Sequence, residues 1–377
     1  MAKAAILGHG VVGSGVAELL IGHADRIAGR AGEPIEVKYI LDIREFPELS
    51  YADRFTRDFE QIVSDPEVEI VIEVIGGLHP AYDFVARALR EGKSVVTSNK
   101  ELVAEKGLEL LAIAREKGVK FLFEASVGGG IPILRPMVRC LAGNEIDSVC
   151  GILNGTTNYI LTKMIRENEP FADALKTAQK LGYAEANPTA DVEGIDACRK
   201  ICILSALMTG KHISPSRIST EGITGITAGL VEAAAKAGCV VKLLGLTRRT
   251  ERGIFAMVAP FAVAKEHPLA GVEDVFNGIL VHGDAVDEVV FIGRGAGKMP
   301  TASAVVGDVI ECVKAAGERN TLEWEEISDK ELLPASEVAF RRLVCFPGGE
   351  SRMTEPMDDA AFAAAYPDPA VRSIRVI

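Results

Sequence analysis

Two charged side chains at helical spacing, Asp196 and Lys200, are the first candidates for chemistry in this sequence. They are four residues apart and therefore project from one face of a helix. Residues 201–208 carry no charge, so this helix enters a core, and Glu185 lies just upstream. Buried charges are costly unless they pair or bind a ligand. The pattern fits either a structural ion pair or a site in which a lysine and acids handle a polar substrate.

The helix that carries this pair is expected to run from a cap at Asp191 to about Met208. A preceding helix opens at Pro170 and closes at Gly182. Residues 187–188, Asn-Pro, then hold the backbone extended before the chain turns helical again.

A glycine-rich turn near the N-terminus is a second candidate site. A short apolar strand, 3–7, leads into Gly8-His-Gly-Val-Val-Gly13, and a helix is expected to about Ile27. This is the dinucleotide-binding fingerprint in its strand–turn–helix context, where glycines allow a tight turn and close approach of the pyrophosphate. The helix N-terminus supplies free amides for phosphate. The cofactor-binding residues predicted here are Gly8, Gly10, Val11, Val12 and Gly13.

The residues expected to meet the cofactor ribose follow a second strand, 34–41. Asp42 can accept hydrogen bonds from the ribose hydroxyls of NAD, whereas Arg44 could meet the 2′-phosphate of NADP. A glycine-rich loop at 29–32 lengthens the crossover beyond the usual spacing. The choice between NAD and NADP therefore stays open.

Strands and helices continue to alternate, with strands at 68–75, 94–98 and 120–127, a helix opened by Pro80 and another at about 102–117. This order predicts a Rossmann-type doubly wound parallel sheet, whose ligands bind beyond the carboxyl ends of the strands. The residues at those ends are Gly76, Gly77, Ser98, Asn99, Lys100 and the run 124–130. Lys100 is thus a second lysine for chemistry, with a solvated surface lysine as the alternative.

The pattern after Gly130 predicts a second domain of α+β type. Helices are expected from Ile131-Pro132, at 157–167 and onward to about Leu246, with strands at 146–153, 254–263, 279–282 and 286–292. The run Asn154-Gly155-Thr156 either caps the 157–167 helix or also serves a site. A second glycine-rich turn, with Gly295 and Gly297, feeds a helix to about Val313 and offers another anion or backbone-approach site.

Three segments follow from this reading. A dinucleotide-binding domain spans 1–130 and is completed by about 296–315. A substrate-binding and dimerisation domain spans 131–295, and an exposed face of its sheet would suit a homodimer. The tail, 316–377, has no assigned role.

Composition excludes several classes. A net charge of −12 argues against nucleic acid and anionic membrane surfaces. The N-terminus enters a strand at once and no long apolar run follows, so a cytoplasmic protein without membrane spans is expected. Seven scattered cysteines form no disulfide framework, and Cys198 and Cys202 are expected to be buried thiols.

Six motifs in order make the sequence resemble homoserine dehydrogenases, over nearly everything from Lys3 to about Val313. They are Gly8-x-Gly-x-x-Gly13, Ser98-Asn-Lys100, Glu124-Ala-Ser-Val-Gly-Gly-Gly-Ile-Pro132, Asn154-Gly-Thr-Thr-Asn-Tyr159, the run 182–200 and the run 293–303. The resemblance implies NAD(P)-dependent interconversion of L-homoserine and L-aspartate 4-semialdehyde, on the route to threonine and methionine.

The resemblance also implies residue roles. Lys200 and Lys100 would flank the reacting carbon, with Asp196 orienting Lys200, and we predict Lys200 as the proton donor with Lys100 as electrostatic support. The implied substrate-binding residues are Glu185, Asn154, Gly155, Thr156 and Asp191. The positions that match a monovalent cation site, usually for sodium and formed largely by backbone carbonyls, are Glu124, Val127, Gly129 and Ile131.

Two departures and two rivals accompany this reading. Arg294 stands where the family commonly has proline, and too few residues follow Leu333 for a complete regulatory ACT domain, so threonine feedback through such a domain is not expected. No kinase domain precedes Met1, so a monofunctional form is expected. A related acylating semialdehyde dehydrogenase would need a nucleophilic cysteine with a nearby base, and no cysteine here is expected at a strand end with such a partner. A nucleotide sensor without chemistry is the other rival, against which the acids and lysines of the motifs are all present.

Overall fold

The computed structural model describes residues 1–318 and 322–377, and the chain divides into two compact units. Unit 1 comprises Met1–Pro136 and Ala296–Glu325, and unit 2 comprises Met137–Gly295 and Glu326–Ile377. The segment predicted as a tail, 316–377, contributes residues to both units, and its residues 319–321 lie outside the described part.

Unit 1 is built on a six-stranded parallel sheet, which confirms the predicted Rossmann-type class. The strand order is β3-β2-β1-β4-β5-β6. Residues Ala4 to Leu7 of the first strand have no exposed surface, because a parallel sheet is covered by helices on both faces. The strands are β1 (Ala2–Leu7), β2 (Ile35–Leu41), β3 (Phe55–Thr56), β4 (Val68–Glu73), β5 (Ser94–Thr97) and β6 (Phe121–Leu122).

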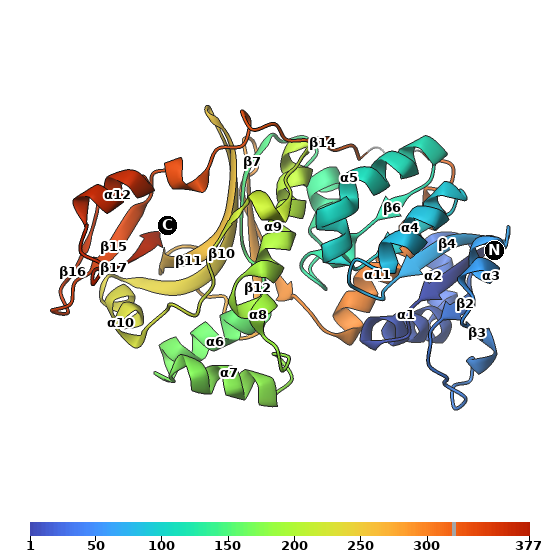
Figure 1. Cartoon of the computed structure of the whole chain (residues 1–377). Coiled ribbons are helices and arrows are strands. Elements are labelled where there is room, and N and C mark those ends of the chain that lie inside the picture. Colours follow the sequence, from blue (N-terminus) through green and yellow to red (C-terminus); the bar gives the residue numbers. More distant parts are fainter. Residues whose placement is uncertain (319–321) are drawn as a thin grey trace. The chain divides into compact units, whose positions relative to one another are not determined.

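The helices of unit 1 cover both faces of this sheet (Figure 1). They are α1 (Val11–Gly22), α2 (Ala24–Ala31), α3 (Phe59–Val63), α4 (Ala81–Arg90), α5 (Lys100–Lys117) and α11 (Lys298–Lys314). Helices α1 and α11 pack closely, because a Cβ at Gly15 would lie only 3.0 Å from the Cβ of Ala302. The C-terminal segment of the unit, α11, thereby completes the core under the glycine-rich turn.

Three expectations for unit 1 were wrong. The helix expected to Ile27 is two helices, since α1 ends at Gly22. The strand expected over 120–127 stops at Leu122, and a 3-10 turn, Glu124–Ser126, replaces its second half. The helix expected from residues 131–132 begins only at residue 134 and continues as a π-helical segment, Pro136–Cys140. The Glu124 carboxylate accepts from the amides of residues 133–135 at the start of this short helical stretch.

Unit 2 is built on a larger, mixed sheet. Its order is β13-β12-β7-β10-β11-β17-β15-β16, with β9 also paired to β11. The strands are β7 (Ile146–Ile152), β9 (Ser219–Thr220), β10 (Cys239–Thr250), β11 (Gly253–Ala264), β12 (Phe276–Gly283), β13 (Asp287–Arg294), β15 (Arg341–Cys345), β16 (Ser351–Met353) and β17 (Arg372–Val376). Two short strands lie outside this sheet, β8 (Lys211–His212) and β14 (Glu325–Glu326), and the chain passes between the units within β14.

Helix α9 packs against β7, β10 and β11, and its buried residues explain the uncharged run after Lys200. The helices of unit 2 are α6 (Gly155–Arg166), α7 (Phe171–Lys180), α8 (Thr189–Val192), α9 (Ile195–Thr209), α10 (Ala228–Lys236) and α12 (Asp359–Ala365).

Two predictions for the helices of unit 2 were wrong. Asp191 does not cap the long helix but lies in α8, because Gly194 at φ 81° separates α8 from α9. The helices expected to Leu246 end with α10, and β10 begins at Cys239.

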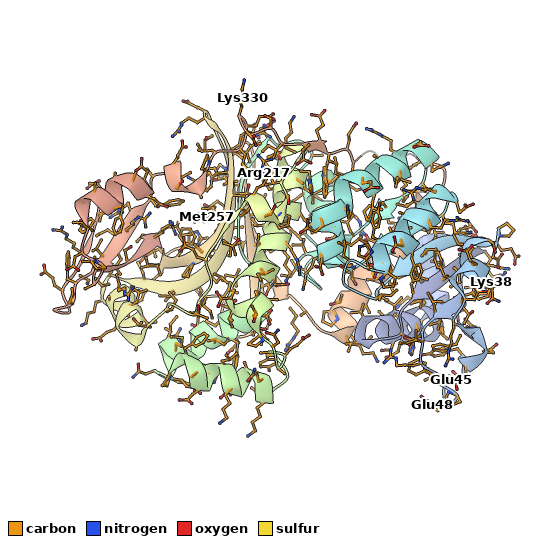
Figure 2. All side chains as sticks on the ribbon, viewed as in Figure 1. Lys38, Glu45, Glu48, Arg217, Met257 and Lys330 are labelled. Atoms are coloured by element: carbon orange, nitrogen blue, oxygen red, sulfur yellow. The ribbon has the colours of Figure 1, made fainter. Side chains whose placement is uncertain are left out.

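The C-terminal segment is part of the second sheet. Strand β17 pairs in parallel with β11, and Ile377 exchanges backbone hydrogen bonds with Ala262 and Ala264. Phe340 packs into the same apolar cluster as Met257 of β11, which is labelled in Figure 2. The segment from β15 onward is therefore a structural component of unit 2.

Candidate functional site

Lys200 and Asp196 form a buried ion pair near the start of α9. The Nζ of Lys200 lies 2.7 Å from Oδ2 of Asp196 and donates a second hydrogen bond, also of 2.7 Å, to the carbonyl oxygen of Leu153. Only 9% and 5% of the two side chains are exposed. Both charges are removed from water, so each depends on the other and on these hydrogen bonds. The structure thus holds a lysine ammonium in one fixed position.

Asn154 joins this pair to a second carboxylate. Its Nδ2 donates to Oδ2 of Asp196 at 2.9 Å and to Oδ1 of Asp191 at 2.7 Å. Its Oδ1 accepts from the backbone amide of Thr157 at 2.8 Å and so caps α6. The cap fixes the amide orientation, and the side-chain amino group therefore bridges the two acids.

The remaining predicted substrate residues surround this cluster to different degrees. Thr156 is nearly buried, and its hydroxyl donates to the carbonyl oxygen of Tyr183 at 2.6 Å. Gly155 lies against the backbone, because a Cβ there would be 2.7 Å from the carbonyl oxygen of Val275. Glu185 is exposed, and its described hydrogen bond is made by its backbone carbonyl to Gln179. Glu185 thus faces solvent.

The glycine-rich turn of unit 1 has the geometry of a phosphate cradle. Gly8 has φ 99°, a conformation that favours glycine. A Cβ at Gly13 would lie 1.9 Å from the carbonyl oxygen of Gly8, so only glycine fits there. Gly10 is the N-cap of α1 and has no side chain to cap it, and Val11, the first helical residue, is 69% exposed. The first amides of α1, including that of Val12, suit an anion such as a pyrophosphate.

Asp42 organises the predicted ribose site. It accepts a hydrogen bond from the backbone amide of His9 at 2.7 Å and forms a two-pronged pair with the guanidinium of Arg44, at 2.9 and 3.0 Å. The Arg44 guanidinium holds the pKa of Asp42 well below its usual range. Arg44 also donates to the carbonyl oxygen of His9. The two candidates for ribose recognition are therefore one hydrogen-bonded unit attached to the glycine-rich turn.

A buried acid lies under the carboxyl ends of β4 and β5. Glu73 has no exposed surface, and burial raises its pKa. Its carboxylate accepts from the amides of Ile75 and Gly76 at 2.8 and 3.1 Å, and from the hydroxyl of Thr97 at 2.5 Å. Asn99 donates to the carbonyl oxygen of Gly77 at 2.6 Å. These bonds tie the loop after β4 to the junction between β5 and α5.

Lys100 is the first residue of α5, directly after this junction. Asn99 is the N-cap and accepts from the amide of Leu102, while the amide of Ser98 donates to the carbonyl oxygen of Glu73 at 3.4 Å. Lys100 belongs to unit 1 and Lys200 to unit 2. Of the second glycine-rich turn, Gly295 belongs to unit 2 and Gly297, at φ 125°, is the N-cap of α11 in unit 1.

Glu124 was predicted at a cation site, and its carboxylate accepts hydrogen bonds from the backbone. Its two oxygens accept from the amides of Ile133, Leu134 and Arg135 at 2.6–2.9 Å. The nearby Val127 and Ile131 are buried, and Gly129 has φ 55°. No cluster of three or more His, Cys, Asp or Glu able to hold a metal occurs in the described ranges 1–318 and 322–377. The Glu124 carboxylate is thus already engaged by backbone amides.

Sequence reasoning missed Glu73, Thr97 and the carbonyl of Leu153. A signal for Glu73 existed, since this acid follows the apolar run 70–72 near the carboxyl end of a parallel strand, where ligands of such sheets bind. The carbonyl of Leu153 carries no sequence signal, because any residue supplies one.

Comparisons with known proteins point to one family. A model described as Homoserine dehydrogenase matches residues 132–310, and one described as Homoserine dehydrogenase, NAD binding domain, matches residues 8–124. The homoserine dehydrogenase of Bacillus subtilis is 42% identical over 315 residues, which cover 83% of this chain and 73% of that protein. That of Corynebacterium glutamicum is 43% identical over 313 residues, 81% of this chain and 70% of the relative.

Solved structures agree. The homoserine dehydrogenase of Thiobacillus denitrificans has a TM-score of 0.92 and 36% identity, covering 100% of this chain and 98% of its own. A hyperthermophilic archaeal homoserine dehydrogenase in complex with NADPH has a TM-score of 0.71 and 27% identity, covering 82% of this chain and 97% of its own. In the described part of the chain, no helix is long and apolar enough to cross a membrane.

Proposed function

This chain belongs to the homoserine dehydrogenase family, and on that premise we propose that it interconverts L-homoserine and L-aspartate 4-semialdehyde with Lys200 as the proton-transferring group. The reaction is an NAD(P)-dependent step of threonine and methionine biosynthesis. The observation that carries the assignment is the hydrogen-bonded cluster in which buried Asn154, Asp196 and Lys200 join the partly exposed Asp191.

The chemistry explains why a buried lysine suits this site. In the reducing direction the nicotinamide, when bound, supplies the hydride to the aldehyde carbon, and the carbonyl oxygen must gain a proton. The ammonium of Lys200 would donate that proton, and its charge would stabilise the developing alkoxide. In the oxidising direction the neutral amine would take the proton of the homoserine hydroxyl. Asp196 and the carbonyl of Leu153 hold Nζ in place for both directions.

The acids of the cluster suit the cationic end of an amino acid. The substrate's ammonium requires carboxylate partners in a site of low water content. We assign Asp191, Asp196 and Glu185 to the substrate's amino and hydroxyl ends, with Gly155 and Thr156 beside them. Asn154 is a positioning residue, because it orients Asp191 and Asp196 relative to each other.

Unit 1 suits the cofactor and the second lysine. The phosphate cradle of Gly8, Gly10 and Gly13 fits a pyrophosphate, and Asp42 with Arg44 fits the ribose of NAD or NADP. The remaining proposed cofactor-binding residues lie at strand and helix ends: Gly76, Ser98, Asn99, Gly295 and Gly297. Lys100 would support the reacting oxygen electrostatically.

A monovalent cation such as sodium is part of the proposal. The backbone carbonyls of Glu124, Val127, Gly129 and Ile131 would hold it, since hard cations prefer oxygen ligands. It would fix the turn that follows β6. Replacing sodium by tetramethylammonium at equal ionic strength should then lower the melting temperature. An unchanged melting temperature would remove the cation from the proposal.

We also propose a cytoplasmic homodimer formed through unit 2. Ile292 on the edge strand β13 is 57% exposed, and an apolar residue on a sheet edge is suited to burial against a second copy. Light scattering after size-exclusion chromatography should give twice the chain mass for wild type and the chain mass for Ile292→Asp. Fractionation of source cells tests the location.

The central test measures homoserine-dependent reduction of NAD and of NADP separately, with Lys200→Ala beside wild type. Lys236→Ala, which removes an exposed lysine from α10, is the control. We expect turnover by wild type and the control, and a loss of about 10²–10⁴-fold in kcat for Lys200→Ala. Loss confined to a Lys100→Ala variant would overturn the assignment of Lys200. No turnover with either cofactor, with binding retained, would favour a nucleotide sensor.

A further inference from the structure

Unit 2 contains a cavity of about 380 Å³ that the proposed reaction does not use. It is lined by residues from α10, β17 and α12 and by Arg342 of β15, elements that lie together in Figure 1. The charged residues of its lining are Glu221, Arg342, Asp359, Arg372 and Arg375. None of the residues assigned to substrate or cofactor lines it.

Arg342 and Arg375 stand directly opposite each other on the antiparallel strands β15 and β17. Each side chain is only 8% exposed. Like charges in this register destabilise a sheet, and removing a guanidinium from water adds a further cost. The arrangement therefore requires negative partners.

Two carboxylates meet part of this requirement. Nη1 of Arg375 donates to Glu221 at 2.7 Å, and Nη2 of Arg342 donates to Asp359. The centre of the Phe362 ring lies 4.5 Å from the guanidinium carbon of Arg342, which adds a cation–π contact. Both Nε atoms are nevertheless buried without a hydrogen-bond partner in the part of the chain that the structure describes. Buried donors in folded proteins are almost always paired, so two unpaired donors on facing arginines indicate that this part of the sheet is short of acceptors.

The charge balance indicates what would pair them. Three arginines line the cavity against two carboxylates, which leaves one positive charge in excess. Thr227, the N-cap of α10, also lines it, and a helix N-terminus adds to a positive potential. A guanidinium presents its N–H groups as a planar fork that matches the oxygens of a carboxylate or phosphate.

We propose that this cavity binds a small oxyanion, a carboxylate or a phosphate, whose oxygens accept hydrogen bonds from the guanidinium groups of Arg342 and Arg375. Arg342 and Arg375 both belong to the C-terminal segment, in β15 and β17. The bound anion would therefore link these two strands within that segment. The proposal is independent of the reaction assigned to Lys200.

Gly225 offers a substitution that tests the cavity without touching the arginines. It lines the cavity, and a Cβ added there would meet nothing within 4 Å. Gly225→Asp places a competing carboxylate in the space, and Gly225→Asn is its neutral counterpart of equal size. Arg342→Lys keeps the charge but removes the planar guanidinium. Arg352→Lys, in β16 and outside the lining, is its control.

The experiment is isothermal titration of the full chain with inorganic phosphate and, separately, with malonate at constant ionic strength. We expect saturable 1:1 binding of at least one anion, weakened at least about tenfold in Gly225→Asp and Arg342→Lys but unchanged in Gly225→Asn and Arg352→Lys. The tighter anion distinguishes phosphate from carboxylate ligands. If Arg342→Lys does not fold, the two Gly225 variants still decide. No saturable binding of either anion by wild type at millimolar concentration, or equal binding by Gly225→Asp and Gly225→Asn, would overturn the proposal.

Discussion

The Nζ of Lys200 lies 2.7 Å from Oδ2 of Asp196, one helical turn away, in a helix whose next residues are buried. Glu232 and Lys236 have the same spacing in α10 and nearly the same distance, 2.8 Å, yet both are 67% exposed. The same sequence spacing therefore occurs in a buried pair and in an exposed pair. The buried pair differs from the surface ion pair in its burial and in the second acid, Asp191, which Asn154 joins to it.

Removing the acid of the buried pair should destabilise the fold strongly. In Asp196→Ala the ammonium of Lys200 would keep only the Leu153 carbonyl among the partners identified above. Breaking a buried pair from one side costs about 3–5 kcal/mol in the free energy of unfolding. Urea unfolding followed by circular dichroism measures it, with Glu232→Ala expected to change little. Equal losses in both variants would contradict a special role for burial.

The two lysines should differ in their pH–rate profiles. If Lys200 transfers the proton, Lys200→Ala should lower kcat and remove the limb of the profile that reports this group. Lys100→Ala should lower the rate while keeping the shape of the profile, because a lysine that supplies only charge transfers no proton during turnover. Steady-state homoserine oxidation, measured from about pH 6 to about pH 10, gives the two profiles, because the pKa of a catalytic group lies near the operating pH. Loss of the limb in Lys100→Ala alone would reverse the roles.

The third glycine of the turn should be far less tolerant than the second. Gly13→Ala puts a Cβ 1.9 Å from the carbonyl oxygen of Gly8, whereas Gly10→Ala meets nothing within 4 Å. Overpacking of this kind costs about 1–3 kcal/mol and moves the backbone that would hold the pyrophosphate. We expect a lower melting temperature for Gly13→Ala and an unchanged one for Gly10→Ala. NADPH binding, followed by fluorescence, should weaken in both variants, because Gly10 lets the backbone approach the pyrophosphate. Equal melting temperatures would show that the close approach at Gly13 is relaxed in solution.

Cofactor choice should depend on Arg44. In the structure its guanidinium lies on Asp42, which leaves the acid less able to receive a ribose hydroxyl. We expect Arg44→Ala to lower kcat/KM for NADP by about tenfold and to maintain or raise that for NAD, because the 2′-phosphate loses its cation. Arg57→Ala, which removes another exposed arginine nearby, is a suitable comparison. A change shared equally by NAD and NADP would mean that Arg44 only supports the turn.

Local sequence patterns predicted the fold correctly where the conformational preference of a short segment agreed with its tertiary contacts. The glycine-rich turn, the alternation of strands and helices in unit 1 and the helical spacing of Asp196 and Lys200 are properties of short segments. The errors lie where distant contacts decided. The backbone amides after Pro132 donate to the Glu124 carboxylate. Gly194 adopts a left-handed conformation that separates two helices, and the residues before it do not predict this.

The site was predictable by residue type but not by partner. Nothing in the sequence says that Asn154 bridges two acids 37 and 42 residues away, or that Arg44 folds back on Asp42. The opposition of Arg342 and Arg375 is equally invisible, since it follows from the register of β15 and β17. Long-range register and burial are fixed by the tertiary structure.

Stability should rise at alkaline pH through Lys242, a buried lysine of β10. Burial lowers its pKa to about 8 from the ordinary 10.5, while Nζ donates to Asn158 and to the carbonyl of Val272. Below pH 8 folded and unfolded chains both carry the proton, so the full cost of burying the charge is present. Between about 8 and 10.5 the folded chain loses the proton first, and the free energy of unfolding should gain up to about 3 kcal/mol. Urea unfolding of wild type against Lys242→Met isolates this gain from other titrating groups, because the methionine variant should lack it. A parallel pH dependence in the two proteins would show that Lys242 titrates normally.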